Sequence, residues 1–159
     1  MAKFLLSLHV LAAVLAIGPV TVAASMFPRV ARTALAEGPD RAGAGASVKL
    51  LYRITQVYAL LGLAVPVLGI GLAQVMGIVG DTWLIVSIAL TVLAALVLLV
   101  LVLPRQEAVV AVLAGEEGSD AASAAGGLKL LMMSTGVFSL LWAAVTVLMV
   151  VRPGSTTGA

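Results

Sequence analysis

Four long runs of apolar residues limit what this chain can fold into more than any other feature. They lie at about 4–27, 54–79, 83–103 and 130–151, and none of the seven Asp and Glu residues falls inside them. A helix needs roughly 20 apolar residues to cross the hydrocarbon core of a bilayer. The sequence therefore predicts an all-α integral membrane protein, with a bundle of four transmembrane helices forming a single domain over residues 1–159.

The composition agrees with a chain whose solvent is lipid. Hydrophobic residues make up 62% of the 159 residues and charged residues only 10%, whereas charged residues make up about 25% of a typical soluble domain. A globule with so few charges could not cover its surface with polar groups. The chain has no cysteine, which excludes disulfides, thiolate metal sites and cysteine nucleophiles.

The first apolar run has an alternative interpretation. Lys3, the apolar residues after it and the sequence VAAS at 22–25 have the layout of a secretory signal peptide. However, the run is long for the apolar core of a signal peptide, and Arg29 and Arg32 follow it. We therefore expect it to remain in the protein as the first span.

The basic residues predict the orientation of the spans. Seven Lys and Arg lie in or beside the connections at about 28–50 and 104–128, and only Lys3 and Arg152 lie at the opposite ends of the spans. Because basic residues concentrate in short cytoplasmic loops, we expect both connections in the cytoplasm. Both termini and the turn at about 80–82 should then face outward. The residues expected to mark topology and contact lipid headgroups are Arg29, Arg32, Lys49, Arg53, Arg105 and Lys129.

The ends of the spans also carry signals for local structure. Each cytoplasmic connection is expected to extend a helix for a few turns and then break, near Gly38 in the first and Gly115 in the second. The tail at 153–159 is expected to be disordered. Trp83 is expected to anchor the outer interface, and the span that it begins, being apolar on all sides, is expected to have the greatest lipid exposure.

An internal repeat relates the second and fourth spans. KLLYRITQVYALLGLAVPVL at 49–68 and KLLMMSTGVFSLLWAAVTVL at 129–148 are identical at eleven of twenty positions. Pro28-Arg29 and Pro104-Arg105 stand in equivalent places after the first and third spans. The sequence therefore predicts a parallel duplication of a two-helix unit. Convergence on a Leu-rich membrane composition is the alternative.

Small residues at helical spacing predict close helix packing. In lipid, helices associate through close backbone approach and dispersion, which small side chains permit. Pro66 should also free the carbonyl of residue 62 and kink the helix, and a hinge or substrate groove at Pro66 and Gly69 is the alternative. The residues expected to pack against another helix are Gly62, Pro66, Gly69, Ala73 and Gly77 in the second span, and Ala12 and Ala16 in the first.

His9 is the only histidine in the chain, and it lies near the outer end of the first span. It has no counterpart in the second half of the repeat. A neutral imidazole hydrogen-bonded across a tight helix contact is one interpretation. An axial ligand of haem b is another, with Met76 or Met149 at a comparable depth as the second ligand. No set of three or four ligands for a bare metal ion is evident.

The sequence contains no catalytic constellation. Ser7 lies two residues from His9, so the two side chains occupy different helix faces. No carboxylate lies within the spans to orient the histidine, as a catalytic triad requires, or to carry protons or ions. We therefore expect that the protein is not an enzyme.

Several segments resemble a known family. LHVLAAVLAIGP at 8–19, LGIGLAQVMGIVGDTWLIVSIAL at 68–90 and LPRQEAV at 103–109 resemble the DUF2269 family of predicted integral membrane proteins, which implies four membrane helices and no established activity. The Leu-His opening also resembles CopD-type and haem-associated four-helix membrane proteins, which usually offer further histidines that this chain lacks. The Ala- and Gly-rich composition is typical of a high-GC bacterium, which would place the protein in the cytoplasmic (inner) membrane.

Three functions are compatible with these features. The sequence favours a structural or accessory subunit of a larger inner-membrane complex, with lipid and other membrane subunits or a second copy as partners, and with no cofactor. The placement of the basic residues argues against a nucleic-acid partner. The alternatives are a haem-binding redox protein that uses His9 and a small transporter built from two-helix repeats.

Overall fold

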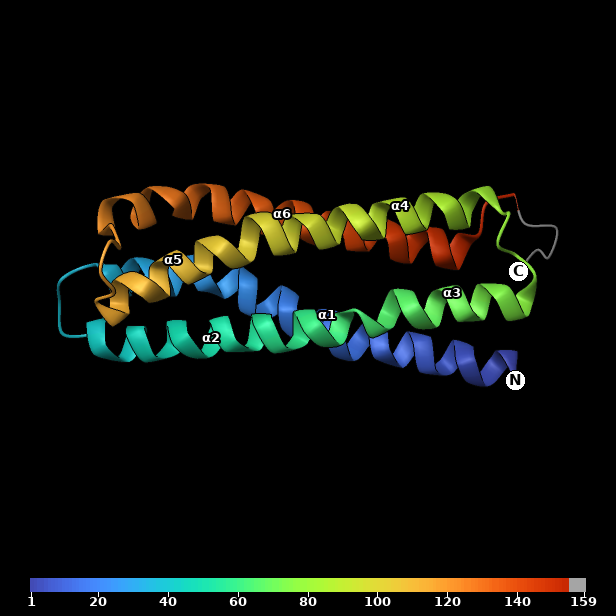
Figure 1. Ribbon diagram of the computed structural model, residues 1–159, viewed down its shortest axis with the longest axis horizontal. Helices are drawn as coiled ribbons and strands as arrows, with labels where there is room; N and C mark the ends of the chain where they lie inside the picture. Colours follow the sequence, from blue (N-terminus) through green and yellow to red (C-terminus); the bar gives the residue numbers. More distant parts are fainter. Residues whose placement is uncertain (155–159) are drawn as a thin grey trace.

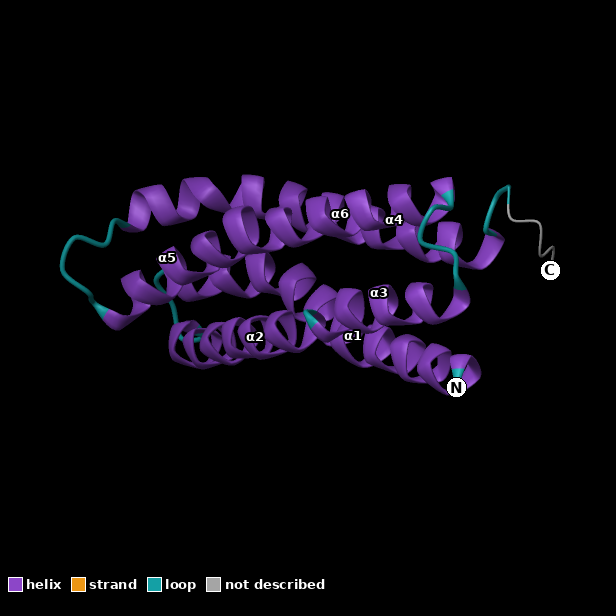
Figure 2. Ribbon diagram, turned by 45° about the vertical axis from the view of Figure 1, so that its right-hand side comes forward, coloured by secondary structure: helices purple, strands orange, loops and turns teal. Residues whose placement is uncertain are grey.

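The computed structural model describes residues 1–154, which form helices joined by short connections, with no strand in that range. Four continuous or nearly continuous helices are long and apolar enough to cross a membrane. They run side by side along the long axis of the molecule, antiparallel to their neighbours in sequence (Figures 1 and 2). The expected all-α four-helix architecture is confirmed. Residues 155–159 of the expected disordered tail lie outside the described residues.

The second and third long helices are each divided into shorter elements. A break separates α2 from α3 at Leu63, and a six-residue π-helix, η1, joins α4 to α5. In chain order the elements are α1 (Ala2–Leu35), α2 (Arg41–Gly62), α3 (Ala64–Met76), α4 (Thr82–Leu96), η1 (Val97–Val102), α5 (Leu103–Ala114) and α6 (Ala121–Val151).

The helices extend well beyond the predicted spans. At 1.5 Å per residue, the 34 residues of α1 measure about 50 Å, against roughly 30 Å for the hydrocarbon core of a bilayer. Most of the connections expected at 28–50 and 104–128 is therefore helical, and only 36–40 and 115–120 lie between helices. Gly115 ends α5 in the left-handed conformation, with φ of 72°, which matches the expected break.

The two ends of the bundle differ. The connections at 36–40 and 115–120 lie at one end, which we call the loop end (Figure 1). Met1, the turn at 77–81 and the C-terminal end of α6 lie at the other, which we call the terminal end. Both expected cytoplasmic connections therefore share one end, and the expected outer turn shares the other with Met1 and the C-terminal end of α6.

Prolines account for both irregular segments. Pro66 has no N–H to donate to the carbonyl of Gly62, and at the break before it Leu63 N donates to Leu60 O, three residues back, at 3.1 Å. Pro104 likewise cannot donate to Val100, which lies within the wider turns of η1. Pro28 and Pro104 do not end their helices, because α1 continues through Pro28 and the third long helix continues through Pro104.

The packed core lies in the loop-end half and the middle of the bundle. All four long helices contribute to it, through buried residues that include Phe27, Val48, Val102, Val109 and Leu131. Near the terminal end the packing is sparser. There α3 packs against α1, and a small cluster of Ala73, Trp83 and Leu84 joins the ends of α3 and α4.

The expectation that the third long helix has the greatest lipid exposure is wrong. The most apolar part of Arg41–Met76 is only 17% buried, against 28% for that of Thr82–Ala114. The second long helix, rather than the third, therefore exposes the larger share of its residues. The second long helix packs mainly against α1, whereas the third long helix packs along its length against α6 and also contacts α1 and α2 through α5.

A polar side chain that sequence reasoning overlooked lies in the core. Gln106, near the start of α5, is fully buried, and neither Oε1 nor Nε2 of its amide has a hydrogen-bond partner among the described residues. A buried polar group without a partner destabilises a fold by about 1–3 kcal/mol. Gln106 is thus a weak point in a core that is largely apolar.

Replacing Gln106 with methionine should stabilise the protein. Gln106→Met keeps the size of the side chain and removes the unpaired amide, so we expect the free energy of unfolding to rise by about 1–3 kcal/mol, measured by thermal unfolding in detergent. The matched control is Gln56→Met, because Gln56 is exposed on α2. An unchanged or lower unfolding temperature for Gln106→Met would mean that the amide has a partner in the membrane-bound protein.

Candidate functional site

A cavity of about 1290 Å³ lies in the terminal-end half of the bundle. Residues of α1 and α3 line one side, and residues of α4 and α6 line the other. The lining is largely apolar, and its polar and charged members are His9, Thr91, Thr146 and Arg152 among the described residues. Small-molecule and cofactor pockets usually measure about 300–1,000 Å³, so this cavity has room for a large ligand.

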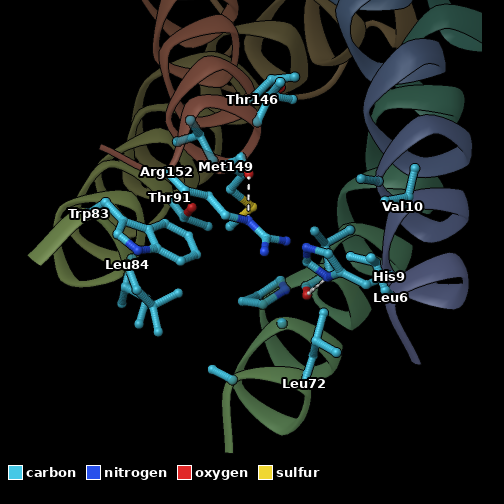
Figure 3. A pocket seen from close by; sticks show the side chains of 18 of the residues that line it. Leu6, His9, Val10, Leu72, Trp83, Leu84, Thr91, Thr146, Met149 and Arg152 are labelled. Carbon is cyan, nitrogen blue, oxygen red and sulfur yellow. Dashed lines mark hydrogen bonds between the residues drawn. The ribbon is translucent and has the colours of Figure 1, made fainter. Parts of the chain in front are cut away.

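His9 is held on the α1 side of the cavity by the backbone of α3. Its side chain is buried, and its Nδ1 lies 3.0 Å from the carbonyl oxygen of Val65. A carbonyl only accepts hydrogen bonds, so Nδ1 carries the proton and donates it. In a neutral ring Nε2 then has a free lone pair. The close-up view shows the imidazole on the cavity wall, facing Arg152 (Figure 3).

A glycine makes room for this imidazole. A Cβ atom on Gly69 would lie 2.9 Å from Cε1 of His9, closer than such atoms approach in folded proteins. Gly69 is one helical turn beyond Val65, so the turn of α3 that supplies the carbonyl also supplies the space. Ala73, one turn further on, is buried. The expected close contact of this face with another helix is therefore present at Gly69 and Ala73.

The rest of the predicted small-residue stripe behaves differently. A Cβ on Gly62 would meet no neighbouring atom within 4 Å, and neither would one on Gly77. Gly77 instead ends α3 in the left-handed conformation with φ of 70°, where Ile78 N donates to Ala73 O. The expectation that Gly62 and Gly77 pack closely against another helix of this chain is therefore wrong. The helix breaks before Pro66, which itself lines the cavity.

The alanines of the first span lie where they can support the same contact. Ala16 is buried and Ala12 is half-buried on α1. Both stand on the helix that packs against α2 and α3.

Arg152 is positioned at the terminal end of the cavity by its own backbone conformation and by contacts with Met149 and Trp83. Its backbone is left-handed, with φ of 44°, the only positive φ of a non-glycine residue in 1–154. Its Nε donates to Met149 O at 3.3 Å, and its guanidinium carbon lies 5.6 Å from the centroid of the Trp83 ring. Trp83 Nε1 in turn donates to Asp81 Oδ2 at 3.0 Å. The guanidinium points across the cavity toward His9 (Figure 3).

These contacts correct the expectation for Trp83. The side chain is only 6% exposed, so it does not project into an interface as a lipid-facing anchor. It packs against Arg152 and holds Asp81 instead. Sequence reasoning treated Arg152 only as one of two basic residues on the outer side, and its position directly after an apolar span was the single signal that could have drawn attention to it.

The two methionines suggested as partners of His9 line the same cavity. Met76 approaches from the end of α3 and Met149 from the end of α6. The hydroxyls of Thr91 and Thr146 donate to carbonyls of their own helices, at 2.7 and 2.9 Å. Apart from the indole of Trp142, the lining side chains left to interact with a ligand through polar atoms or sulfur are therefore His9, Met76, Met149 and Arg152.

The donor set does not suit a bare metal ion. Within residues 1–154, no group of three or more His, Cys, Asp and Glu side chains could hold one. An imidazole and a thioether are, however, a known pair of axial ligands for haem iron, whose four other ligands come from the porphyrin.

The predicted headgroup-binding residues lie away from the cavity, toward the loop end. Arg105 is half-buried and its Nη1 donates to Leu101 O at 2.7 Å, and Arg32 Nη2 approaches Met132 Sδ at 3.8 Å. The exposed members of this set are Arg29, Arg32, Lys49, Arg53 and Lys129.

Comparisons of the chain with family models, with curated proteins and with solved structures find no match. The cavity must therefore be interpreted from its own chemistry and geometry.

Enlarging Gly69 should disrupt the contact between α1 and α3. Gly69→Ala places a methyl group against the His9 ring, so we expect the Nδ1–Val65 bond to be lost and the free energy of unfolding to fall by about 1–3 kcal/mol. Gly71→Ala is the matched control on the same helix, since its Cβ would meet no atom within 4 Å. Thermal unfolding in detergent distinguishes the two, and equal behaviour of both variants would contradict the His9 geometry.

Proposed function

We propose that this chain is a haem-binding integral membrane protein, with His9 Nε2 as an axial ligand of the iron. The observation that carries the proposal is a single histidine whose Nδ1–H is held by the Val65 carbonyl on the wall of a large, mostly apolar cavity. Metal-ligating histidines characteristically donate their other ring N–H to a carbonyl or carboxylate, which fixes the ring and leaves one lone pair for the metal.

The rest of the cavity fits a haem group. Met149 or Met76 would offer a thioether as a further ligand of the iron, and the apolar walls would keep water from the porphyrin. Bound haem would supply one-electron transfer, and His/Met ligation favours a raised reduction potential. No Asp or Glu lines the cavity among the described residues, which supports an electron carrier over an enzyme with acid–base chemistry.

The proposal includes a place in the membrane. We propose that the loop end faces the bacterial cytoplasm, because the exposed basic residues lie toward it. The terminal end, with Met1 and the C-terminal end of α6, then faces outward, and the cavity lies in the outer half of the bilayer. Membership of the DUF2269 family stays a prediction from the segments that resemble it.

A duplication of a two-helix unit is supported by the packing. α1 pairs with α2 and α3, and the third long helix pairs with α6, so the bundle consists of two antiparallel hairpins. Thr55 and Thr135, which are equivalent in the sequence repeat, are both buried. His9 belongs to the first hairpin alone, so in this proposal the haem site arose in one copy of the unit.

An accessory role in a larger membrane complex is the second candidate. It is favoured by the second long helix, because only 17% of its most apolar part is buried in the isolated chain and the helix can offer a face to another membrane subunit or a second copy. Purification in mild detergent tests it, because a stable complex should co-purify, and a monodisperse single chain would count against it. The apolar lining of the cavity does not favour the transporter alternative.

The haem proposal predicts an absorption spectrum. Protein purified from cells supplied with haem, or titrated with haemin, should show a Soret band that is lost in His9→Ala and unchanged in Ser7→Ala, where the exposed Ser7 hydroxyl bonds only to its own helix. Met149→Leu and Met76→Leu identify the second ligand, since one of them should alter the spectrum while haem stays bound. A wild-type protein that stays colourless under both conditions would refute the proposal.

The orientation can be tested by single-cysteine labelling, because the chain has no cysteine of its own. We expect a membrane-impermeant maleimide to label Gly80→Cys in intact cells and to label Ser119→Cys only after the cells are opened. Both positions are exposed and lie in connections at opposite ends of the bundle. The reverse pattern would place the terminal end in the cytoplasm.

A further inference from the structure

We infer that the cavity recognises an anionic group on its ligand and that Arg152 is the residue that binds it. The inference rests on the proposed haem site, in which the anionic groups are the carboxylates of the porphyrin side chains. The inference orients the ligand in that site, with the iron at His9 and the carboxylates toward the terminal end.

The first support is the charge of the cavity. Arg152 is the only charged residue among the described lining residues. Arg152 is only half-buried, but a ligand that covers it would remove it from water, and this is unfavourable unless the ligand brings an opposite charge or hydrogen-bond acceptors. The positive guanidinium therefore selects a ligand that brings a negative group to this end and an apolar body to the rest of the space.

The second support is the unused hydrogen-bonding capacity of the guanidinium. Arginine has five N–H donors, and Nε–H of Arg152 donates to Met149 O. That is the only hydrogen bond of this side chain within residues 1–154. The four N–H groups on the two Nη atoms form the fork that binds a carboxylate through two parallel hydrogen bonds.

The third support is the way Arg152 is held. A left-handed backbone costs a non-glycine residue about 1–2 kcal/mol, and here it directs the side chain back over the cavity instead of away from the bundle (Figure 3). The Trp83 ring supports one side of the guanidinium, and Asp81 holds the Trp83 indole. The side chain is thus oriented before a ligand arrives, which reduces the entropy lost on binding.

The test compares haemin with haemin dimethyl ester, in which the carboxylates are blocked and the porphyrin and iron are unchanged. Each is titrated into the ligand-free full-length protein in detergent, and the dissociation constant is measured from the Soret band. Hydrogen bonds to a charged group typically contribute enough to change affinity by about 10- to 100-fold. We expect wild-type protein to bind haemin more tightly than the ester by a factor in this range.

Variants test whether Arg152 causes the preference for haemin over its dimethyl ester. Arg152→Gln should bind haemin and the ester with similar affinity, close to that of wild type for the ester, whereas Arg152→Lys should keep part of the preference because it retains the charge without the fork. Arg53→Gln is the control, since Arg53 is exposed on α2 and does not line the cavity. It should behave as wild type.

The outcomes separate this inference from the proposed function. If wild type binds haemin and its ester equally, or if Arg152→Gln weakens both by the same factor, the inference is overturned and the haem site stands. If wild type binds neither compound, the proposed function fails and the inference fails with it. The comparison of the two compounds on wild-type protein requires no variant, so misfolding of Arg152→Gln would not prevent a decision.

Discussion

The hydrogen bond from His9 Nδ1 to the carbonyl of Val65 connects the two sides of the first hairpin near the terminal end. Near the terminal end, α3 packs against α1 and has only the small cluster around Ala73 to join it to α4. The position of α3, and with it one wall of the cavity, therefore depends on this bond and on the space that Gly69 leaves for the imidazole. In a low-dielectric setting such a bond is also strong, because water does not compete for its partners.

The bundle combines a closed half with an open half. At the loop end and in the middle, buried residues from all four long helices form a continuous core, which holds the four helices together. Toward the terminal end the hairpins separate enough to leave the cavity. The irregular segments at Leu63 and η1 lie in the second and third long helices, and both follow from prolines that remove a helical hydrogen bond. The closely packed loop-end half can therefore hold the four helices together while the terminal-end half leaves room for the cavity.

The sequence was sufficient to predict the four-helix architecture and part of the candidate site, namely His9 and the two methionines. Apolar length identified the four helices, and glycine placed the end of α5 at Gly115. A lone histidine among alanines indicated a tight helix contact, and Met76 and Met149, which were grouped by their expected depth, line the same cavity. Helical periodicity, however, shows that a face is buried without showing which partner covers it. For that reason Gly62 and Gly77 were assigned the same role as Gly69, although Gly77 caps a helix.

The arrangement of Arg152 and Trp83 could not be predicted from the sequence for a different reason. Their arrangement depends on the left-handed backbone at Arg152 and on the conformation of the turn that brings Asp81 Oδ2 to the Trp83 indole. Neither has a local sequence signature, because arginine rarely adopts that conformation and the turn is fixed by the ends of α3 and α4. The unpaired amide of Gln106 could not be predicted for a similar reason, since its burial depends on long-range packing between helices.

Because His9 is the only histidine, nitrogen NMR of protein labelled with ¹⁵N-histidine reports on the central hydrogen bond without interference from any other residue. In ligand-free protein at neutral pH, we predict a single neutral tautomer with the proton on Nδ1 and an unprotonated Nε2. A spectrum with the proton on Nε2, or with the averaged signals of a freely exchanging imidazole, would contradict the bond to Val65 and the site built on it.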